Sequence, residues 1–180
     1  WFKRGIRLSL GFVVGESKPT SVTAITSRSL SVGEYIKISI DEGEILGLVE
    51  RSSVSSAAFT DVKNFHEAEE STEIADINKR DKTFTAHIGI LGFLDNLRKG
   101  QSIIPAIPPI PGTEITHPTN QDLEEIFSPK KEGWLKIGNL LRNKEIEAKI
   151  NLDKIVSRHL GILAMTGMGK SNLVSLITKK

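Results

Sequence analysis

The sequence contains no cysteine among its 180 residues. This absence excludes disulfide bonds and thiolate metal sites, and it agrees with a reducing, intracellular compartment. No apolar run approaches the roughly 18 residues that a membrane-spanning helix needs, and no secretory signal is recognisable. The net charge of +2 is too small to indicate nucleic-acid binding by itself. We therefore expect a cytoplasmic protein with no membrane partner.

What is present fits a folded protein. Hydrophobic residues make up 38% of the chain and charged residues 26%, which is enough apolar material for a core. The length accommodates one domain plus part of a second. Because the sequence starts at Trp1 rather than at methionine, we expect its N-terminus to be trimmed from a longer polypeptide.

One motif near the C-terminal end carries specific chemistry. The sequence Ala-Met-Thr-Gly-Met-Gly-Lys-Ser at 164–171 fits the phosphate-binding loop pattern, with Ala164 at the position of the first glycine. An apolar run at 155–163 precedes it and predicts a buried parallel strand, and the run at 172–180 predicts a helix. Such a match arises by chance in about one chain in a hundred of this length. The motif predicts a nucleoside triphosphate site.

Each residue of the loop has an expected role. Gly167 and Gly169 allow backbone conformations in which successive N–H groups point at phosphate oxygens. Lys170 would place its ammonium group against the β- and γ-phosphates, and Ser171 would bind Mg²⁺. The helix that begins near Lys170 would direct its positive dipole end at the same anion. The predicted nucleotide-binding residues are Thr166, Gly167, Met168, Gly169, Lys170 and Ser171.

The first hundred residues predict an antiparallel β-barrel or sandwich. The segment 35–40 alternates strictly and turns at 41–43 into the segment 44–50, which is typical of a hairpin. Glycines inside the runs, Gly11, Gly47 and Gly89, mark positions where a barrel would bend. The other predicted strands are 7–14, ending at Gly15, 21–25, 83–91 and 101–104. The predicted fold is mainly β: a small N-terminal barrel, then the beginning of an α/β RecA-like ATPase domain.

The stretch from about 52 to 79 interrupts the barrel pattern. We interpret it as an insertion with a short helix, or as a poorly ordered excursion. Its acidic side chains lack the spacing of metal ligands, so a solvated helical face is a better interpretation than a metal site. The group consists of His66, Glu67, Glu69, Glu70 and Glu73.

Proline marks the connection between the two predicted domains. The prolines in 105–112 exclude a helix or a central strand and predict a stiff, extended segment. A short helix over 119–127, capped by Thr119 or Asn120, should end before Pro129, and strands should follow at 134–138 and 146–152. The predicted domains are 1–104, the barrel; 105–132, the connector; and 133–180, the start of the ATPase domain.

These motifs together resemble the HerA family of archaeal hexameric DNA translocases and helicases. The resemblance extends over most of the chain and is weakest across 52–79. Met168 departs from the family, whose loops usually have serine there, but this position contributes mainly its backbone N–H. The residues that carry the resemblance are 11–15, 32–35, 47–50, 88–92, 97–100, 105–112, 137–140 and 157–171.

The resemblance implies an ATP- and Mg²⁺-dependent motor that pumps duplex DNA through a homo-hexameric ring. It also implies a partnership with a NurA-type nuclease in the resection of DNA ends, with the barrel as the collar that assembles the ring and docks the nuclease. The family's Walker B strand, sensor residues and arginine finger would lie beyond Lys180, so we assign no catalytic residue, and we expect no ATP turnover from these 180 residues alone.

Two other functions stay open. The chain fits a non-catalytic barrel module for ring assembly and nuclease docking, because one strand and one short helix cannot form an ATP site. It also fits a ring ATPase that moves protein, since phosphate-binding loops serve many motors. Four basic residues could contact DNA, although ordinary surface charge is the better interpretation: Arg98, Lys99, Lys130 and Lys131. No chemistry is assigned to the four scattered histidines: His66, His87, His117 and His159.

Overall fold

The computed structural model describes residues 9–77, 82–157, 161–163, 165 and 167–178. The chain divides into two compact units, Trp1–Pro118 and Thr119–Lys180. Within the described ranges, no helix is both long and apolar enough to cross a membrane.

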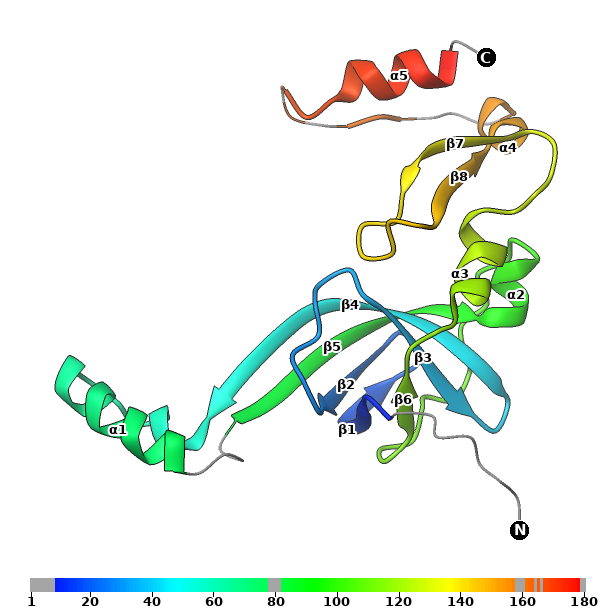
Figure 1. Cartoon of the computed structure of the whole chain (residues 1–180). Coiled ribbons are helices and arrows are strands. Elements are labelled where there is room, and N and C mark those ends of the chain that lie inside the picture. Colours follow the sequence, from blue (N-terminus) through cyan, green and yellow to red (C-terminus); the bar gives the residue numbers. More distant parts are fainter. Residues whose placement is uncertain (1–8, 78–81, 158–160, 164, 166, 179–180) are drawn as a thin grey trace. The chain divides into compact units, whose positions relative to one another are not determined.

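The first unit is a closed antiparallel barrel, as the sequence predicts (Figure 1). Its strands follow the order β1-β2-β5-β4-β3-β6 around the barrel. The predicted hairpin is confirmed, because β3 and β4 pair from Tyr35 opposite Leu48 to Ile40 opposite Gly43. The strands are β1 (Gly11–Lys18), β2 (Ser21–Thr26), β3 (Tyr35–Ile40), β4 (Gly43–Ser56), β5 (Lys82–Phe93) and β6 (Glu114–Thr116).

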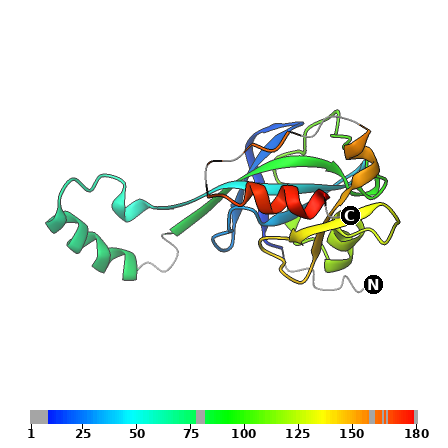
Figure 2. The same ribbon diagram turned by 90° about the horizontal axis from the view of Figure 1, so that it is seen from above.

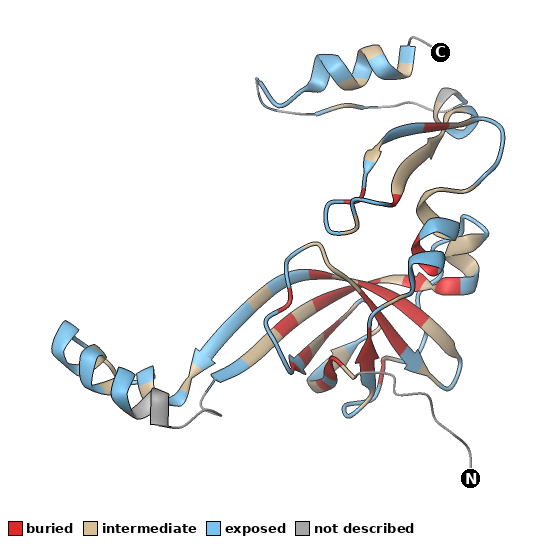
Figure 3. Cartoon of the chain, in the orientation of Figure 1, coloured by how far each residue is buried: buried red, intermediate tan, exposed pale blue. Residues whose placement is uncertain are grey.

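Residues from all six strands form the hydrophobic core of the barrel, and Figure 3 colours the buried positions red. Ile36 and Ile38 of β3 show the two-residue period of a strand, since both are fully buried and their side chains share the inner face. This core depends on residues far apart in sequence: Val13, Val22, Ala24, Ile36, Ile38, Ile45, Val49, Ala86, Ile88, Ile90 and Ile115 all belong to it.

The predicted end of the first strand and the predicted strand 101–104 are both wrong. β1 does not end at Gly15 but continues to Lys18, because Gly15 adopts a φ of 66° and the pairing with β2 shifts register there. The predicted strand 101–104 is irregular. Its carbonyl at Ile103 accepts one bond from the N–H of Phe93, at 2.9 Å, and Pro105 then removes the next donor.

Strand β6 closes the barrel instead. It lies within the predicted connector and pairs with β1 and β3, with Ile115 opposite both Gly11 and Ile38. Between Ile103 and β6 the proline-rich segment is neither helix nor strand, as expected.

Two of the marked glycines permit close approach of neighbouring strands. A Cβ atom on Gly11 would collide with the carbonyl oxygen of Ile25, and one on Gly47 would lie 2.5 Å from the Ile88 side chain. The pairing of β4 with β5 also shifts register between Leu46 and Gly47, so Gly47 stands at the predicted irregularity.

The insertion forms the tip of a two-stranded ribbon (Figure 2). β4 and β5 stay paired as far as Ser56 opposite Lys82, past Phe84, where the pairing of β5 with β2 ends. The short helix η1 (Ala57–Phe59) and the helix α1 (Phe65–Ile77) follow, so the predicted helix is confirmed. Its glutamates at 67, 69, 70 and 73 are exposed. The barrel also carries α2 (Leu94–Arg98) after β5.

The second unit begins with α3 (Asn120–Phe127). Of the two predicted caps, Thr119 is the one that caps this helix: its hydroxyl accepts from the Asp122 N–H at 3.1 Å, and the Asp122 carboxylate accepts from the Thr119 N–H at 2.9 Å. The two predicted strands are confirmed as an antiparallel hairpin of β7 (Trp134–Asn139) and β8 (Glu147–Asn151).

The predicted strand 155–163 is wrong wherever the structure describes it. Ile155 and Val156 belong to α4 (Leu152–Val156), and Gly161–Leu163 has no regular structure. A parallel strand is held by its neighbours in a sheet, and the described part of this unit contains only the β7–β8 pair. The helix α5 (Lys170–Thr178) follows the loop, as expected.

Candidate nucleotide-binding site

The loop before α5 has the backbone that the motif predicts. Gly167 adopts a φ of 85° and Gly169 a φ of 79°. Residues with a side chain rarely adopt this left-handed region, so both positions favour glycine. An added Cβ atom at either glycine would meet no other atom within 4 Å. The requirement for glycine here is therefore conformational, unlike that at Gly11.

Helix α5 starts at Lys170, at the end of the loop. The first bond of the helix runs from the Leu173 N–H to the Gly169 carbonyl oxygen, at 3.1 Å. The N–H groups at the start of a helix have no acceptor within it, and they carry the positive end of the helix dipole. The loop therefore leads directly to an end of a helix that favours anions.

The side chains of Lys170 and Ser171 occupy the first two positions of α5, and both residues are exposed. Met168 is 70% exposed, and its N–H closes a turn by donating to the Met165 carbonyl oxygen at 3.3 Å. Thr166 and Ala164 lie outside the described residues.

This arrangement fits a polyphosphate. Two left-handed glycines, a helix start, an ammonium group and a hydroxyl are concentrated within five residues, 167–171. These are the groups that hold phosphate oxygens and their Mg²⁺ ion in phosphate-binding loops. Within the described ranges, no cluster of three or more His, Asp or Glu residues could hold a metal ion by itself.

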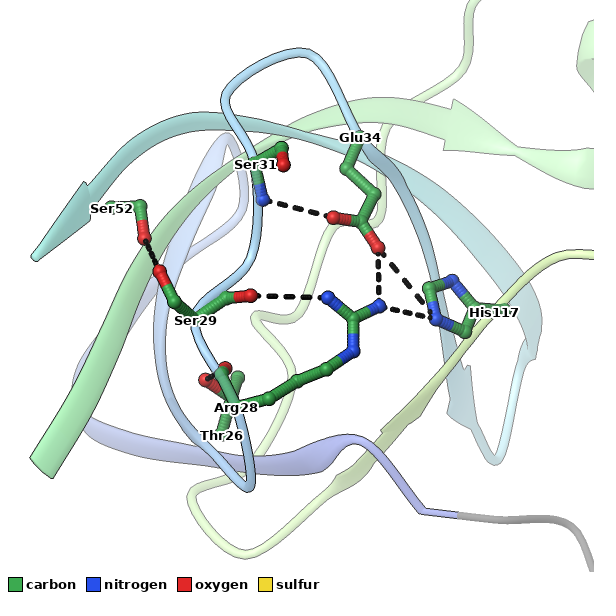
Figure 4. Close-up of polar contacts among 7 residues, drawn as sticks. All are labelled: Thr26, Arg28, Ser29, Ser31, Glu34, Ser52 and His117. Carbon is green, nitrogen blue, oxygen red and sulfur yellow. Dashed lines mark hydrogen bonds and ion pairs between the residues drawn. The ribbon is translucent and has the colours of Figure 1, made fainter. Parts of the chain in front are cut away.

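A second polar cluster lies in the barrel, at the loop between β2 and β3 (Figure 4). The Arg28 guanidinium donates from Nη2 to the Glu34 carboxylate at 2.7 Å and from Nη1 to the Ser29 carbonyl oxygen at 3.0 Å. The Ser31 N–H donates to the other oxygen of Glu34, at 2.9 Å. His117, which follows β6, places Nε2 at 2.9 Å from Arg28 Nη2 and 3.6 Å from the Glu34 carboxylate.

The electrostatics of this cluster favour one protonation state. Burial raises the pKa of Glu34, but the bonds from Arg28 and Ser31 and the nearby positive charges outweigh burial, so the net shift is downward. Burial lowers the pKa of His117; Glu34 opposes this shift and the Arg28 charge adds to it, and the pKa stays below its ordinary value. Neutral His117 accepts from Arg28 through Nε2. The cluster ties the end of β6 to the β2–β3 loop.

Sequence reasoning missed this cluster. Arg28 and His117 are 89 positions apart, and neither belongs to a recognisable motif. Barrel closure by β6 brings them together, and β6 was itself not predicted.

The remaining candidate residues show ordinary surface or structural contacts. Arg98 pairs with Asp95 at 2.8 Å, while Lys99, Lys130 and Lys131 are exposed. His87 makes a hydrogen bond with the Thr23 hydroxyl at 3.1 Å, as expected for a strand histidine. His66 lies 3.8 Å from Glu70 on α1, and His159 is outside the described residues.

Comparison with known proteins identifies related chains. Residues 135–180 match the family described as helicase HerA, central domain. A protein named probable helicase MJ1565, from Methanocaldococcus jannaschii, is 34% identical over 95% of this chain and 33% of its own length. The DNA double-strand break repair helicase HerA of Sulfolobus acidocaldarius is 31% identical over 96% of this chain and 33% of its own length. That of Pyrococcus furiosus is 30% identical over 94% of this chain and 31% of its own length. The chain therefore spans about a third of the length of these relatives.

Proposed function

This chain belongs to the HerA family, and from that premise we propose that it is the part of an ATP-driven DNA helicase that carries the barrel and the phosphate-binding loop. Relatives that match it almost from end to end are named DNA double-strand break repair helicases. These names favour a role in DNA break repair.

The observation that supports the proposal best is the loop geometry. A chance match to the motif would not require Gly167 and Gly169 to adopt left-handed backbone conformations immediately before a helix. In phosphate-binding loops, such glycine conformations let successive N–H groups point at phosphate oxygens. The left-handed glycines and the helix start at Lys170 therefore support nucleotide binding independently of the sequence match.

In the proposed site, the backbone of 166–169 and the Lys170 ammonium bind the phosphates of ATP, and the Ser171 hydroxyl binds Mg²⁺. ATP supplies the free energy for movement along DNA when it is hydrolysed. The residues of this chain bind and orient the phosphates; the groups that activate water and stabilise the transferred phosphoryl group belong to further parts of a motor domain.

The proposed assembly is a homo-hexameric ring around duplex DNA, with a NurA-type nuclease as partner. The barrel has a hydrophobic core of its own within the first unit. This independence supports a role for the barrel in the assembly that is separate from the ATP site. In this role it forms no part of the ATP site and serves as the collar that joins subunits and docks the nuclease.

The test uses a polypeptide extended to the length of the HerA relatives. Lys170→Ala should weaken ATP binding by about tenfold or more, because a charge-assisted contact to phosphate is lost, and it should abolish DNA-stimulated ATP hydrolysis. Lys144→Ala, which removes an exposed lysine outside the loop, is the matched control. Unchanged nucleotide affinity after loss of the Lys170 ammonium would contradict the proposal. Stimulation of the ATPase by unfolded polypeptide instead of duplex DNA would favour a protein-moving ring.

A further inference from the structure

The segment between α2 and β6 exposes its four isoleucines and buries two of its four prolines. Ile103, Ile104, Ile107 and Ile110 are 47%, 42%, 63% and 69% exposed, and we call these four residues the isoleucine strip. Pro105 and Pro109 of the same segment are buried. Single exposed apolar residues are ordinary, but four within eight positions form a patch of the kind that marks interaction surfaces.

Hydrogen bonds fix this segment to the barrel on both sides. The Phe93 N–H donates to the Ile103 carbonyl oxygen at 2.9 Å, and the Gly112 N–H donates to the Val13 carbonyl oxygen at 2.7 Å. The Thr113 hydroxyl donates to the Ile110 carbonyl oxygen at 2.6 Å. Because the prolines also restrict φ, little conformational entropy remains to be lost when another molecule covers the strip.

Two hollows border the strip, and both are acidic. One, of about 250 Å³, lies between Ile107–Ile110 and the β3–β4 turn and is lined by Asp41 and Glu42. The other, of about 450 Å³, is lined by Ile103, Phe93 and Leu94 together with Glu42, Glu44 and Asp95. No lysine or arginine lines either hollow.

The carboxylates of the two hollows are not equivalent. Lys37 pairs with Glu44 at 3.1 Å, and Arg98 pairs with Asp95 at 2.8 Å. Asp41 and Glu42 are exposed, and no ion pair joins them to another described residue. They form the part of the rim that is best placed to attract a cation from outside.

We propose that the isoleucine strip docks a segment of a partner protein that carries aliphatic side chains beside a lysine or arginine. The aliphatic groups would cover the strip, and the basic side chain would reach Asp41 and Glu42. Nucleic acid and anionic lipid do not fit, because the rim repels phosphates. A two-fold contact between copies does not fit either, since it would bring two acidic rims together; a head-to-tail contact between copies is a separate outcome of the experiment below.

The inference gives a location to the docking role proposed for the barrel, and in that respect it rests on the proposed function. It does not depend on nucleotide binding. Loss of ATP binding in Lys170→Ala would leave it untouched, and absence of peptide binding would leave the nucleotide site untouched. The two proposals therefore fail separately.

The experiment selects binders of the 180-residue chain from a library of short random peptides and measures their affinities by fluorescence polarisation. Selected peptides should combine aliphatic residues with a net positive charge. Ile107→Asp and Ile110→Asp should each weaken their binding by about tenfold or more, the effect of losing a central interface side chain. The double variant Asp41→Asn, Glu42→Gln should weaken it about two- to fivefold per charge pair and reduce its salt dependence.

Ile25→Asp is the matched control, since Ile25 is 45% exposed on β2 and lies outside the strip. The Ile25→Asp variant should bind the peptides with the same affinity as the unaltered chain. Three results would overturn the inference: no selected peptide depends on Ile107 or Ile110; acidic peptides are selected as often as basic ones; or Ile107→Asp dissociates an oligomer of the chain alone, which would make the strip a contact between copies.

Discussion

The substitution Glu34→Gln tests whether the cluster at the β2–β3 loop stabilises the barrel. One carboxylate oxygen of Glu34 accepts from Arg28 at 2.7 Å, and the other accepts from the Ser31 N–H at 2.9 Å. Glutamine has a single oxygen, so whichever way its amide is turned, one of these donors faces an N–H₂ group. Each variant molecule must therefore lose one charge-assisted or backbone hydrogen bond.

The expected cost follows from the exposure of the pair. A hydrogen bond to a charged group contributes about 1.5–3 kcal/mol when it is well shielded from water. The side chain of Glu34 is 14% exposed, but that of Arg28 is 49% exposed, and water screens part of the interaction. We therefore expect Glu34→Gln to lower the free energy of opening by about 1–2 kcal/mol.

Hydrogen exchange of the β3 amides is the appropriate assay, because it reports on the barrel independently of the second unit. The backbone of Glu34 accepts from the Val49 N–H at 2.9 Å, so loosening at Glu34 reaches the start of β3 directly. A loss of 1–2 kcal/mol should speed the exchange of the Ile36 and Ile38 amides by a factor of about 5–30. Glu16→Gln is the control, since the Glu16 side chain is 82% exposed.

A double-mutant cycle with Arg28→Met can refute this reasoning. If the cost arises from the Arg28–Glu34 pair, Glu34→Gln should matter much less in the Arg28→Met background. An equal cost in both backgrounds would show that the interaction between Arg28 and Glu34 contributes nothing to the stability of the loop.

Three further predictions concern pH, the core and the helix cap. Folding lowers the pKa values of His117 and Glu34, so their contributions to the stability of the barrel are fully present above the unfolded pKa values of 6.5 and 4.5 and are lost as the pH falls below each. Exchange of the β3 amides as a function of pH should show the loss that arises from His117 in the unaltered chain and in the control His66→Gln. His117→Gln should not show it. Ile38→Ala should destabilise the barrel by about 2–5 kcal/mol in urea unfolding, since Ile38 is fully buried, whereas Ile25→Ala at an exposed position should cost far less. Thr119→Ala should destabilise α3 by about 1 kcal/mol, seen as faster exchange of its first-turn amides, with no effect on β3 exchange.

Local patterns were sufficient to predict the elements that sequence reasoning found. The alternation in 35–40 and the turn at 41–43 predict the β3–β4 hairpin because side chains of period two select one face of a sheet. Thr119 and Asn120, both of residue types that commonly cap helices, predict the start of α3 in the same way. Both signals act within about ten residues, and tertiary context does not override them.

The failures involve elements that depend on distant partners. Strand β6 has three residues, too few for a periodic pattern, and it exists because β1 and β3 offer hydrogen bonds on either side. The run 155–163 has the apolar composition of a parallel strand, but such a strand needs neighbours. Without them in the described chain, the local signal prevails: the Asn151 side chain accepts from the Lys154 N–H at 2.9 Å and caps α4.

Closure of the barrel restricts how a partner can bind it. In a closed barrel the backbone donors and acceptors of the strands are paired, so a partner strand has no edge to extend. Among the described strands, β4 keeps an open edge beyond Val49, because there it pairs only with β5. That edge reads Arg-Ser-Ser-Val-Ser-Ser over 51–56, a polar sequence with a charge of the kind that discourages edge pairing. Recognition of the barrel must then depend on side chains, and the isoleucine strip is the surface where apolar area, rigidity and uncompensated charge coincide.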